Sequence, residues 1–322
     1  MRNCWLLLLG CLAAACGGNF SNDDLEFLNA LPTREDLASE LPGSSGTVLE
    51  GGLRRRTDAL AVAVGEPSEL YRDTREASDT FNNGMDGLLT LLEEIRKLPP
   101  TTREPELRVW GPWPAPEHPG HEVRFAMKRE PERFIYLLQY RTRGAGEEGW
   151  WSALEGSFQP DGGLRKGTGA VRLLVKETKA HGFDVGGLAN LDLLEIVYQT
   201  RALPITVRMR FVPAAPRTAS EILYAYRELP GGLGEMGFLL EDTDILPGTR
   251  KEDLAIISRW TKDQGGVGII SVTGGDVPMG FTATQVECWD ASFRVTYLKR
   301  SWETAEVGSA SACPDVSALE QP

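Results

Sequence analysis

The stretch ITVRMRF at residues 205–211 indicates the fold of most of this 322-residue chain. Its apolar residues alternate with Thr206, Arg208 and Arg210, and a period of two places the two sets on opposite faces of a β-strand. One face of this strand is therefore apolar and the other meets water, which is typical of an antiparallel sheet. The preceding stretch LLEIVYQTR, at residues 193–201, is also rich in strand-forming residues.

Short strands of this kind extend in both directions, from Leu107 to Leu298, and many are separated by turns such as Pro160-Asp161-Gly162-Gly163. The other strands that we predict span residues 107–110, 122–127, 134–142, 151–158, 169–176, 222–227, 235–240, 254–260, 268–272, 284–289 and 293–298. Short strands in succession without helical crossovers indicate an antiparallel sheet. We therefore predict that residues 101–322 form a mainly β domain, an antiparallel meander that makes a barrel, a half-barrel or a sandwich.

A helical segment precedes the strands, within residues 47–100. Ser68 can cap the helix, and Pro99-Pro100 ends it. Apolar residues recur at steps of four and three and so share one face of this helix: Phe81, Met85, Leu88, Leu92 and Ile95. A coiled coil with a partner would need a longer repeat, so we predict that this face packs against the β domain.

Residues 1–15 have the pattern of a secretion signal, with Arg2 before the apolar runs Trp5–Leu9 and Leu12–Ala15. A membrane-spanning helix needs about 20 apolar residues, and we expect no such segment later in the chain. The signal ends in Leu12-Ala13-Ala14-Ala15-Cys16, which resembles the lipobox of bacterial lipoproteins. This resemblance implies cleavage before Cys16, acylation of that cysteine and attachment to membrane lipid.

An earlier cysteine offers a second reading of the lipobox. Leu8-Leu9-Gly10-Cys11 fits the consensus better, but it leaves an apolar region of about five residues where roughly 7 to 15 are usual. We therefore prefer Cys16, with an ordinary cleaved signal as the alternative. Gly17 follows Cys16, and the resemblance then implies an envelope protein sorted to the outer membrane. We expect residues 16–46 to form a lipid-anchored tether with short helical turns.

The cysteines also fit an exported protein. Cys4 and Cys11 leave with the signal and Cys16 takes the lipid, so Cys288 and Cys313 remain. An even remainder in an oxidising compartment predicts a disulfide, which would close a loop of about 25 residues and add roughly 3 kcal/mol. The tail from Cys288 to Cys313 also resembles lipoproteins of Gram-negative bacteria, which implies no activity.

The charge balance limits the partners. The chain has 34 Lys and Arg against 46 Asp and Glu, and losing Arg2 with the signal changes the net charge from -12 to -13. This balance argues against binding nucleic acid, and against binding anionic headgroups through charge alone.

Few residues suggest chemistry. His118-Pro119-Gly120-His121 lacks a third metal ligand, and His181 lies far away in the sequence. The fingerprint Gly232-Leu233-Gly234-Glu235-Met236-Gly237 precedes a strand, whereas nucleotide binding needs a helix there. No nucleophile elbow occurs, although an acidic pair distant in sequence stays open. We expect no metal, no cofactor and no catalysis.

The adjacent tryptophans Trp150 and Trp151 are the candidate ligand surface. If both lie in one strand, their rings point to opposite faces, and only one can join the core. An exposed ring can stack on a sugar or line a ligand pocket, but a neighbouring loop more often covers it.

These observations favour a non-catalytic, acyl-anchored β domain that binds or scaffolds something at the envelope. An alternative is a carrier of lipid or another hydrophobic ligand, in which the helix plugs a cup formed by the sheet. A large apolar cavity between helix and sheet would favour the carrier, and a space filled by side chains would count against it. A hydrolase of glycan or ester is a third hypothesis.

Overall fold

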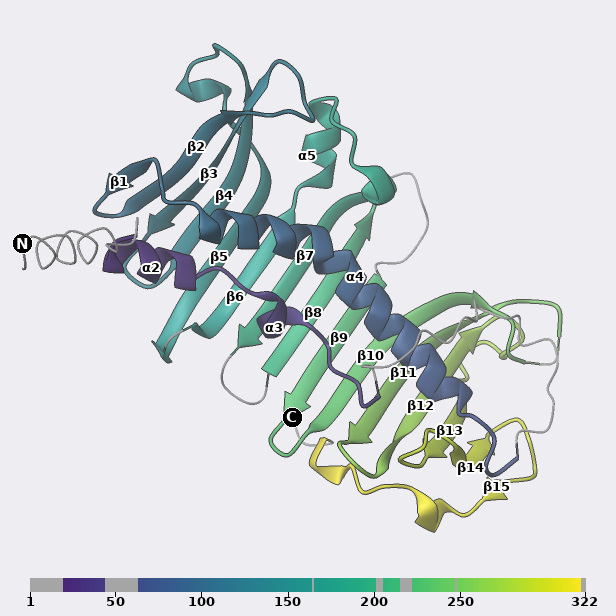
Figure 1. The fold of residues 1–322 in the computed structure, drawn as a ribbon. Helices are drawn as coiled ribbons and strands as arrows, with labels where there is room; N and C mark the ends of the chain where they lie inside the picture. Colours follow the sequence, from purple (N-terminus) through teal and green to yellow (C-terminus); the bar gives the residue numbers. More distant parts are fainter. Residues whose placement is uncertain are drawn as a thin grey trace, which may run out of the picture.

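A computed structural model describes residues 20–43, 63–163, 165–200, 205–214, 222–246 and 248–319. Within these ranges, fifteen strands form one antiparallel sheet, and their order in the sheet is their order in the chain (Figure 1). The strands are β1 (Thr102–Glu104), β2 (Leu107–Pro114), β3 (His121–Arg129), β4 (Phe134–Thr142), β5 (Trp151–Gly163), β6 (Lys166–Leu173), β7 (Leu191–Thr200), β8 (Ile205–Pro213), β9 (Ile222–Leu229), β10 (Leu233–Thr243), β11 (Glu252–Thr261), β12 (Gly265–Gly274), β13 (Ala283–Trp289), β14 (Val295–Arg300) and β15 (Val307–Gly308).

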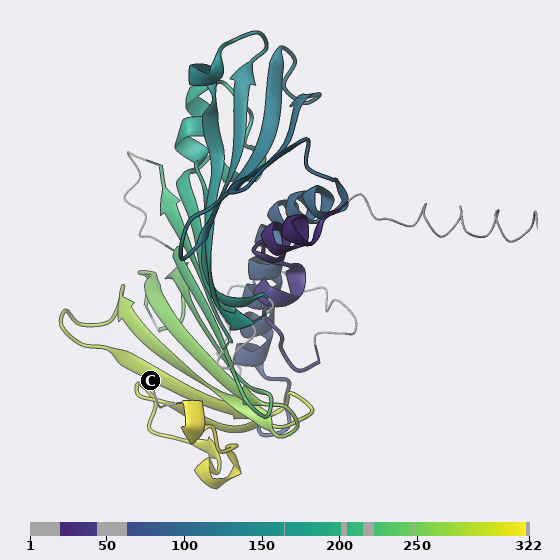
Figure 2. The ribbon, with the colours of Figure 1, turned by 90° about the vertical axis from the view of Figure 1, so that its left-hand side faces the viewer.

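Four α-helices accompany the sheet in the described ranges: α2 (Asn22–Asn29), α3 (Arg34–Leu37), α4 (Glu69–Lys97) and α5 (Val175–Ala180). Short 3-10 turns are η1 (Glu147–Gly149), η2 (Gly186–Leu188), η3 (Ala310–Ala312) and η4 (Ser317–Leu319). Figure 2 shows the sheet curving around α2, α3 and α4, which lie on its concave side.

The predicted mainly β meander with a packed N-terminal helix is confirmed. The sheet is curved but not closed, because β1 pairs only with β2 and β15 only with β14 among the described strands. Of the three forms that the sequence left open, the half-barrel is therefore the nearest. Both edge strands are short, and all three residues of β1 are exposed.

The alternation in residues 205–211 appears as predicted in β8, where Val207 and Met209 are fully buried and Arg208 is exposed. One predicted strand is too long. The strand expected at residues 169–176 ends at Leu173, because the amide of Thr178 bonds to the carbonyl of Leu174 at 2.9 Å as α5 begins. A Val-Lys pair at a helix start therefore looked like the end of a strand.

Helix α4 crosses the concave face diagonally (Figure 1). The Ser68 side chain caps it by accepting a hydrogen bond from the Tyr71 amide at 3.0 Å, and the helix ends two residues before Pro99. All five residues of the predicted apolar face are at most 7 % exposed: Phe81, Met85, Leu88, Leu92 and Ile95. The helix is thus held to its own domain by its apolar face.

Glycines in the sheet let aromatic rings lie flat beneath this helix layer. Tyr136 lies over its cross-strand partner Gly156, and Tyr198 lies over Gly169. A Cβ atom at either glycine would collide with the ring. This pairing of a glycine with a cross-strand aromatic fixes the position of the ring and keeps the floor of the concave face continuous.

Candidate functional site

The concave face carries a second covering segment besides α4. Residues 20–43, which we call the strap, contain α2 and α3 and lie on the same side of the sheet as α4 (Figure 2). Six of its apolar side chains are at most 6 % exposed: Phe27, Leu28, Ala30, Leu31, Leu37 and Leu41. The strap occupies most of the range in which the sequence predicted a tether; Cys16 lies outside the described residues.

One ionic contact holds the start of the strap. Asp24 is fully buried and accepts hydrogen bonds from Nε of Arg108 at 2.6 Å and Nε of Arg103 at 3.0 Å. Burial would raise the pKa of Asp24, but the hydrogen bonds from Ser21, Arg108 and Arg103 outweigh it and lower the pKa to about 2. Arg108 also lies 4.7 Å from the ring centre of Phe27. Ion pairs and apolar packing therefore both hold α2 against the sheet.

A second ionic contact holds α3. Asp36 accepts hydrogen bonds from the amide and hydroxyl of Thr33, at 2.8 and 2.7 Å, and pairs with Arg165 in the turn between β5 and β6. Burial would raise the pKa of Asp36, but the hydrogen bonds from Thr33 and the charge of Arg165 hold it below its usual value. Arg96 of α4 donates to the carbonyl of Leu31.

The backbone of Arg165 is constrained. Its φ of 55° lies in the left-handed region, which costs a non-glycine residue about 1 to 2 kcal/mol. The buried hydroxyl of Thr200 donates to the Arg165 carbonyl at 2.9 Å and holds this conformation. Such conformations persist where surrounding contacts define them, and they are common in binding sites.

Two tyrosines complete this region, which we call the arginine–tyrosine cluster: Asp36, Arg96, Arg165, Tyr136 and Tyr198. The tyrosines are 0 % and 2 % exposed, and burial raises the pKa of both. In the described part of the chain, Nε of Arg96 and Nε of Arg165 are buried and have no hydrogen-bond partner. The two phenols lie close enough for the Tyr198 hydroxyl to donate to the Tyr136 oxygen, although the geometry of that bond is poor. Buried polar atoms in proteins rarely lack a hydrogen-bond partner.

A pocket lies at the other end of the strap. Its volume is about 180 Å³, and its walls include Pro42, Tyr71, Trp260, Trp289, Phe293 and Lys262. The Tyr71 hydroxyl donates to the Pro42 carbonyl at 2.6 Å, and its ring stacks on Phe293 at 4.0 Å. A space of this size can hold one aromatic ring or a short apolar chain.

The space beneath α4 is filled by side chains. Phe81, Met85, Leu89 and Leu92 are at most 2 % exposed, and Phe81 meets Tyr224 of β9 at 6.4 Å between ring centres. This is the arrangement that counts against a carrier in which α4 alone plugs an open cup.

The two candidate tryptophans do not occupy one strand. Trp150 follows η1, and the guanidinium groups of Arg124 and Arg141 lie 4.2 and 4.5 Å from its ring centre. Trp151 begins β5 and stacks on His181 at 4.1 Å and on Tyr140 at 5.5 Å. Neighbours therefore cover ring surface of both residues.

The three histidines belong to one aromatic cluster around Phe183 and Trp151, although His181 is far from the other two in the sequence. His118 stacks on Phe183 at 3.6 Å, and His121 meets the same ring edge-on at 4.9 Å. The sequence signal that could have found this cluster was the confinement of all histidines to residues 118–181. Among the described residues, no group of three or more His, Cys, Asp or Glu side chains is placed to hold a metal ion.

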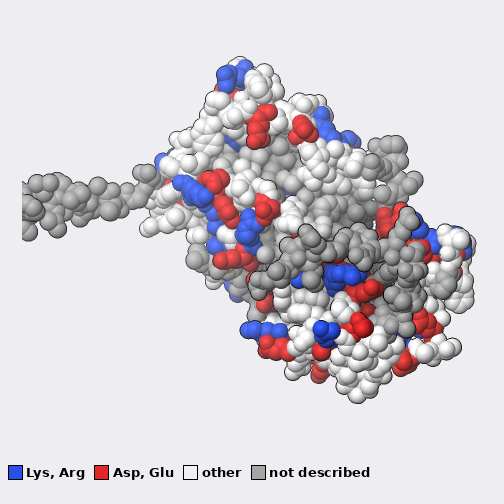
Figure 3. Space-filling view, turned by 45° about the vertical axis from the view of Figure 1, so that its right-hand side comes forward, with Lys and Arg blue, Asp and Glu red and all other residues white. Residues whose placement is uncertain are grey.

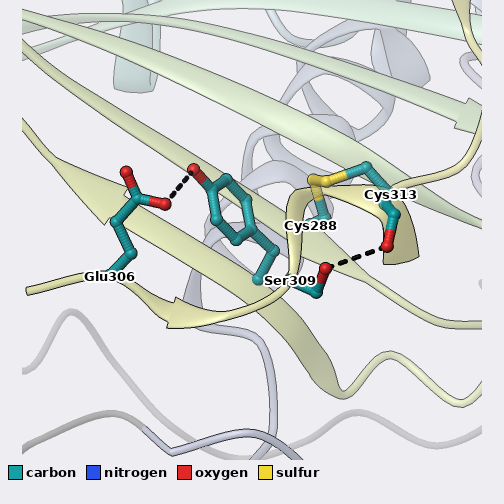
Figure 4. Close-up of a disulfide and its surroundings, with 6 residues drawn as sticks. Cys288, Glu306, Ser309 and Cys313 are labelled. Atoms are coloured by element: carbon teal, nitrogen blue, oxygen red, sulfur yellow. Dashed lines mark hydrogen bonds between the residues drawn. A yellow bond between two sulfur atoms is a disulfide. The ribbon is translucent and has the colours of Figure 1, made fainter.

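The remaining sequence-predicted positions have structural roles. Cys288 and Cys313 form a disulfide that joins β13 to the C-terminal segment, beside Glu306 and Ser309 (Figure 4). The glycines of residues 232–237 lie in a turn and in β10 and open no helix. On the face drawn in Figure 3, basic side chains lie among acidic ones and form no large patch of one sign.

No known protein family, curated protein or solved structure matches this chain. Across the described ranges, none of the helices combines the length and apolar character that a membrane crossing requires.

Proposed function

We propose that this chain is an acyl-anchored envelope lipoprotein whose β domain binds a ligand or partner without catalysis. The observation that carries this proposal is the strap, an ordered segment fastened over the concave face by Asp24 and Asp36. It begins at Phe20, only four residues after Cys16. Four residues span at most about 14 Å, so acylation of Cys16 would hold the concave face close to the membrane surface.

The anchor is tested by the mass and location of the protein. The intact mass of the detergent-extracted protein, measured with and without reduction, should show acyl chains on Cys16 and two hydrogens gained at Cys288 and Cys313. The Cys16→Ala variant should leave the membrane fraction, because one cysteine carries the lipid. The matched variant Cys11→Ala should stay membrane-bound, and release of Cys11→Ala alone would move the anchor to that residue.

A second candidate function is the carriage of a hydrophobic ligand. It is favoured by the strap, because this short segment covers part of the concave face with buried apolar side chains. An apolar ligand could take the place of these side chains. Organic extraction of the purified protein, followed by mass spectrometry, should then recover a lipid or apolar compound in an amount comparable to the protein. Recovery of none from protein purified without detergent would count against the carrier.

A further inference from the structure

The arginine–tyrosine cluster has more hydrogen-bond donors than acceptors. Two guanidinium groups and two phenols lie beneath the strap, and Asp36 is the carboxylate that pairs with Arg165 there. Glu93 also acts on Arg96, but its side chain is 40 % exposed and lies 3.8 Å from Arg34. The Tyr198 hydroxyl has the Tyr136 oxygen beside it as an acceptor, so the donors left without one are Nε of each arginine and the Tyr136 hydroxyl.

The charge balance within the cluster points the same way. Burial and the positive charge of Arg165 lower the pKa of Arg96 to about 10, in spite of the opposing effect of Asp36. Two half-buried cations that repel each other are stabilised by anions placed between them, and arginine is well suited to bind carboxylate or phosphate. The cluster thus has the chemistry of an anion site.

The strap provides an acidic group and apolar groups in one short segment. Asp36 pairs with Arg165, while the neighbouring side chains of Leu31 and Leu37 are at most 1 % exposed. An amphiphile combines the same two features, because its anionic head corresponds to Asp36 and its apolar tail corresponds to the leucine side chains. We propose that the cluster is the head-group site for such an amphiphile, whose single carboxylate or phosphate replaces Asp36 when the strap moves aside.

This inference rests on the proposed binding function and names the chemical class of the ligand. The tail would replace the apolar side chains of the strap on the concave face. The donors to the head group would be Arg96, Arg165, Tyr136 and Tyr198. The role of Asp36 is then to satisfy the site while it holds no ligand.

The test compares three probes on the folded chain with Cys16 replaced by Ala: oleate, dodecanol and inorganic phosphate. They present an anionic head with a tail, a neutral head with a tail, and an anionic head alone. We expect Asp36→Asn to bind oleate about ten-fold more tightly than the parent does, with dodecanol affinity changed less than three-fold. Phosphate alone should bind only weakly, because it lacks the tail.

Asp36→Asn could also raise oleate binding simply by loosening the strap, which would admit any amphiphile. The control for this effect is Asp24→Asn. This substitution also removes a strap carboxylate from its arginine partners, but these partners are Arg103 and Arg108, which do not belong to the cluster. It should leave the ratio of oleate to dodecanol affinity unchanged, whereas Asp36→Asn should raise that ratio several-fold. Equal ratios in the two variants would overturn the proposal, as would phosphate binding as tightly as oleate.

The donors are tested in the Asp36→Asn background. Adding Arg165→Gln should return oleate affinity to the parental value or below, and Tyr198→Phe, which keeps the buried ring, should weaken it about three-fold. Tyr198→Phe keeps the assay informative if the arginine variant does not fold. Unchanged oleate affinity in Tyr198→Phe and Tyr136→Phe would exclude the phenols from the site. The anchor and the ligand site are tested separately. If the Cys16→Ala variant stays in the membrane fraction but the oleate-to-dodecanol affinity ratios change as expected, the ligand site is supported and only the proposed anchor is wrong.

Discussion

The two ends of α4 meet the sheet in different ways. At the N-terminal end, Leu70 lies on Gly268, and the hydroxyls of Thr74 and Ser258 are 2.5 Å apart. At the C-terminal end, the sheet presents large rings and the strap shares the covering layer, with Arg96 bonded to the Leu31 carbonyl.

Close approach of a helix to a sheet requires small residues, and direct hydrogen bonds then fix its position. The N-terminal end of α4 has both, including the Ser68 hydroxyl, which donates to the buried Glu287 at 2.5 Å. The C-terminal end instead depends on a separate segment with its own ionic contacts. We therefore expect the strap to open as a local unit while the N-terminal end of α4 stays in place.

The strongest test removes apolar contact from the strap. Phe27→Ala should cost the strap about 4 kcal/mol, because Phe27 is fully buried and packs edge-on against Phe134 at 5.3 Å. Hydrogen exchange of strap amides should accelerate by up to about a thousand-fold, with little change in β10–β12. The control Leu25→Ala, at a residue 47 % exposed on the same helix, should have little effect. Equal acceleration throughout the chain would show that the strap is not a local unit.

The converse test pushes the N-terminal end of α4 away from the sheet. Gly268→Val places methyl groups where Leu70 lies and should destabilise the whole domain by about 2 to 3 kcal/mol in urea unfolding. Gly237→Val on β10 is the matched control, since a Cβ there meets only the Ile256 carbonyl oxygen, at 3.9 Å. A stable Gly268→Val protein would mean that this end of the helix is free to shift.

Acid should separate the two ends without any substitution. The pKa of Asp24 falls from 3.8 to about 2 on folding, so its charged form stabilises the strap. This contribution, about 2 kcal/mol, is complete above pH 4 and is lost as the pH falls towards 2. Protease cleavage within the strap should rise over this pH range and should rise less in Asp24→Asn, which lacks the titrating group. Cleavage that does not depend on pH would contradict the role of Asp24.

The smallest effect is expected at the rim, away from both ends of α4. Trp150→Ala removes cation–π contacts with Arg124 and Arg141 at a partly exposed site and should cost about 1 kcal/mol or less. The urea midpoint should shift slightly, and the binding of oleate should stay the same. A large loss of oleate binding would move the ligand site from the strap to the rim.

Local patterns predicted the regular parts of this fold. The alternation in residues 205–211 identified β8, and the apolar spacing from Phe81 to Ile95 identified the buried face of α4. Both patterns depend only on neighbouring residues and on the periods of strand and helix. Whether the sheet closes depends on its accumulated curvature and on what covers it, so the open form was left undecided.

The candidate site could not be predicted in the same way. Asp36 and Arg165 are 129 residues apart, and nothing in the sequence around either one indicates the other. Tyr136 and Tyr198 have the appearance of ordinary strand aromatics, and the approach of their phenols to each other is evident only in the folded sheet. The pair Trp150-Trp151 was the more conspicuous candidate in the sequence, yet neighbouring side chains cover part of both rings.

The short edge strands have a consequence for crowding. An open sheet is a template for another copy of itself, because its outer strands have unused backbone groups. Here the edge strand β1 consists only of Thr102-Arg103-Glu104, and β15 consists only of Val307-Gly308. Each of these strands offers a neighbouring copy few backbone groups for pairing, and β1 also presents charged side chains. Many copies held side by side in a two-dimensional layer would meet at these edges often. If acylation of Cys16 holds the protein at a membrane as proposed, these short edges would limit polymerisation edge to edge at high surface density.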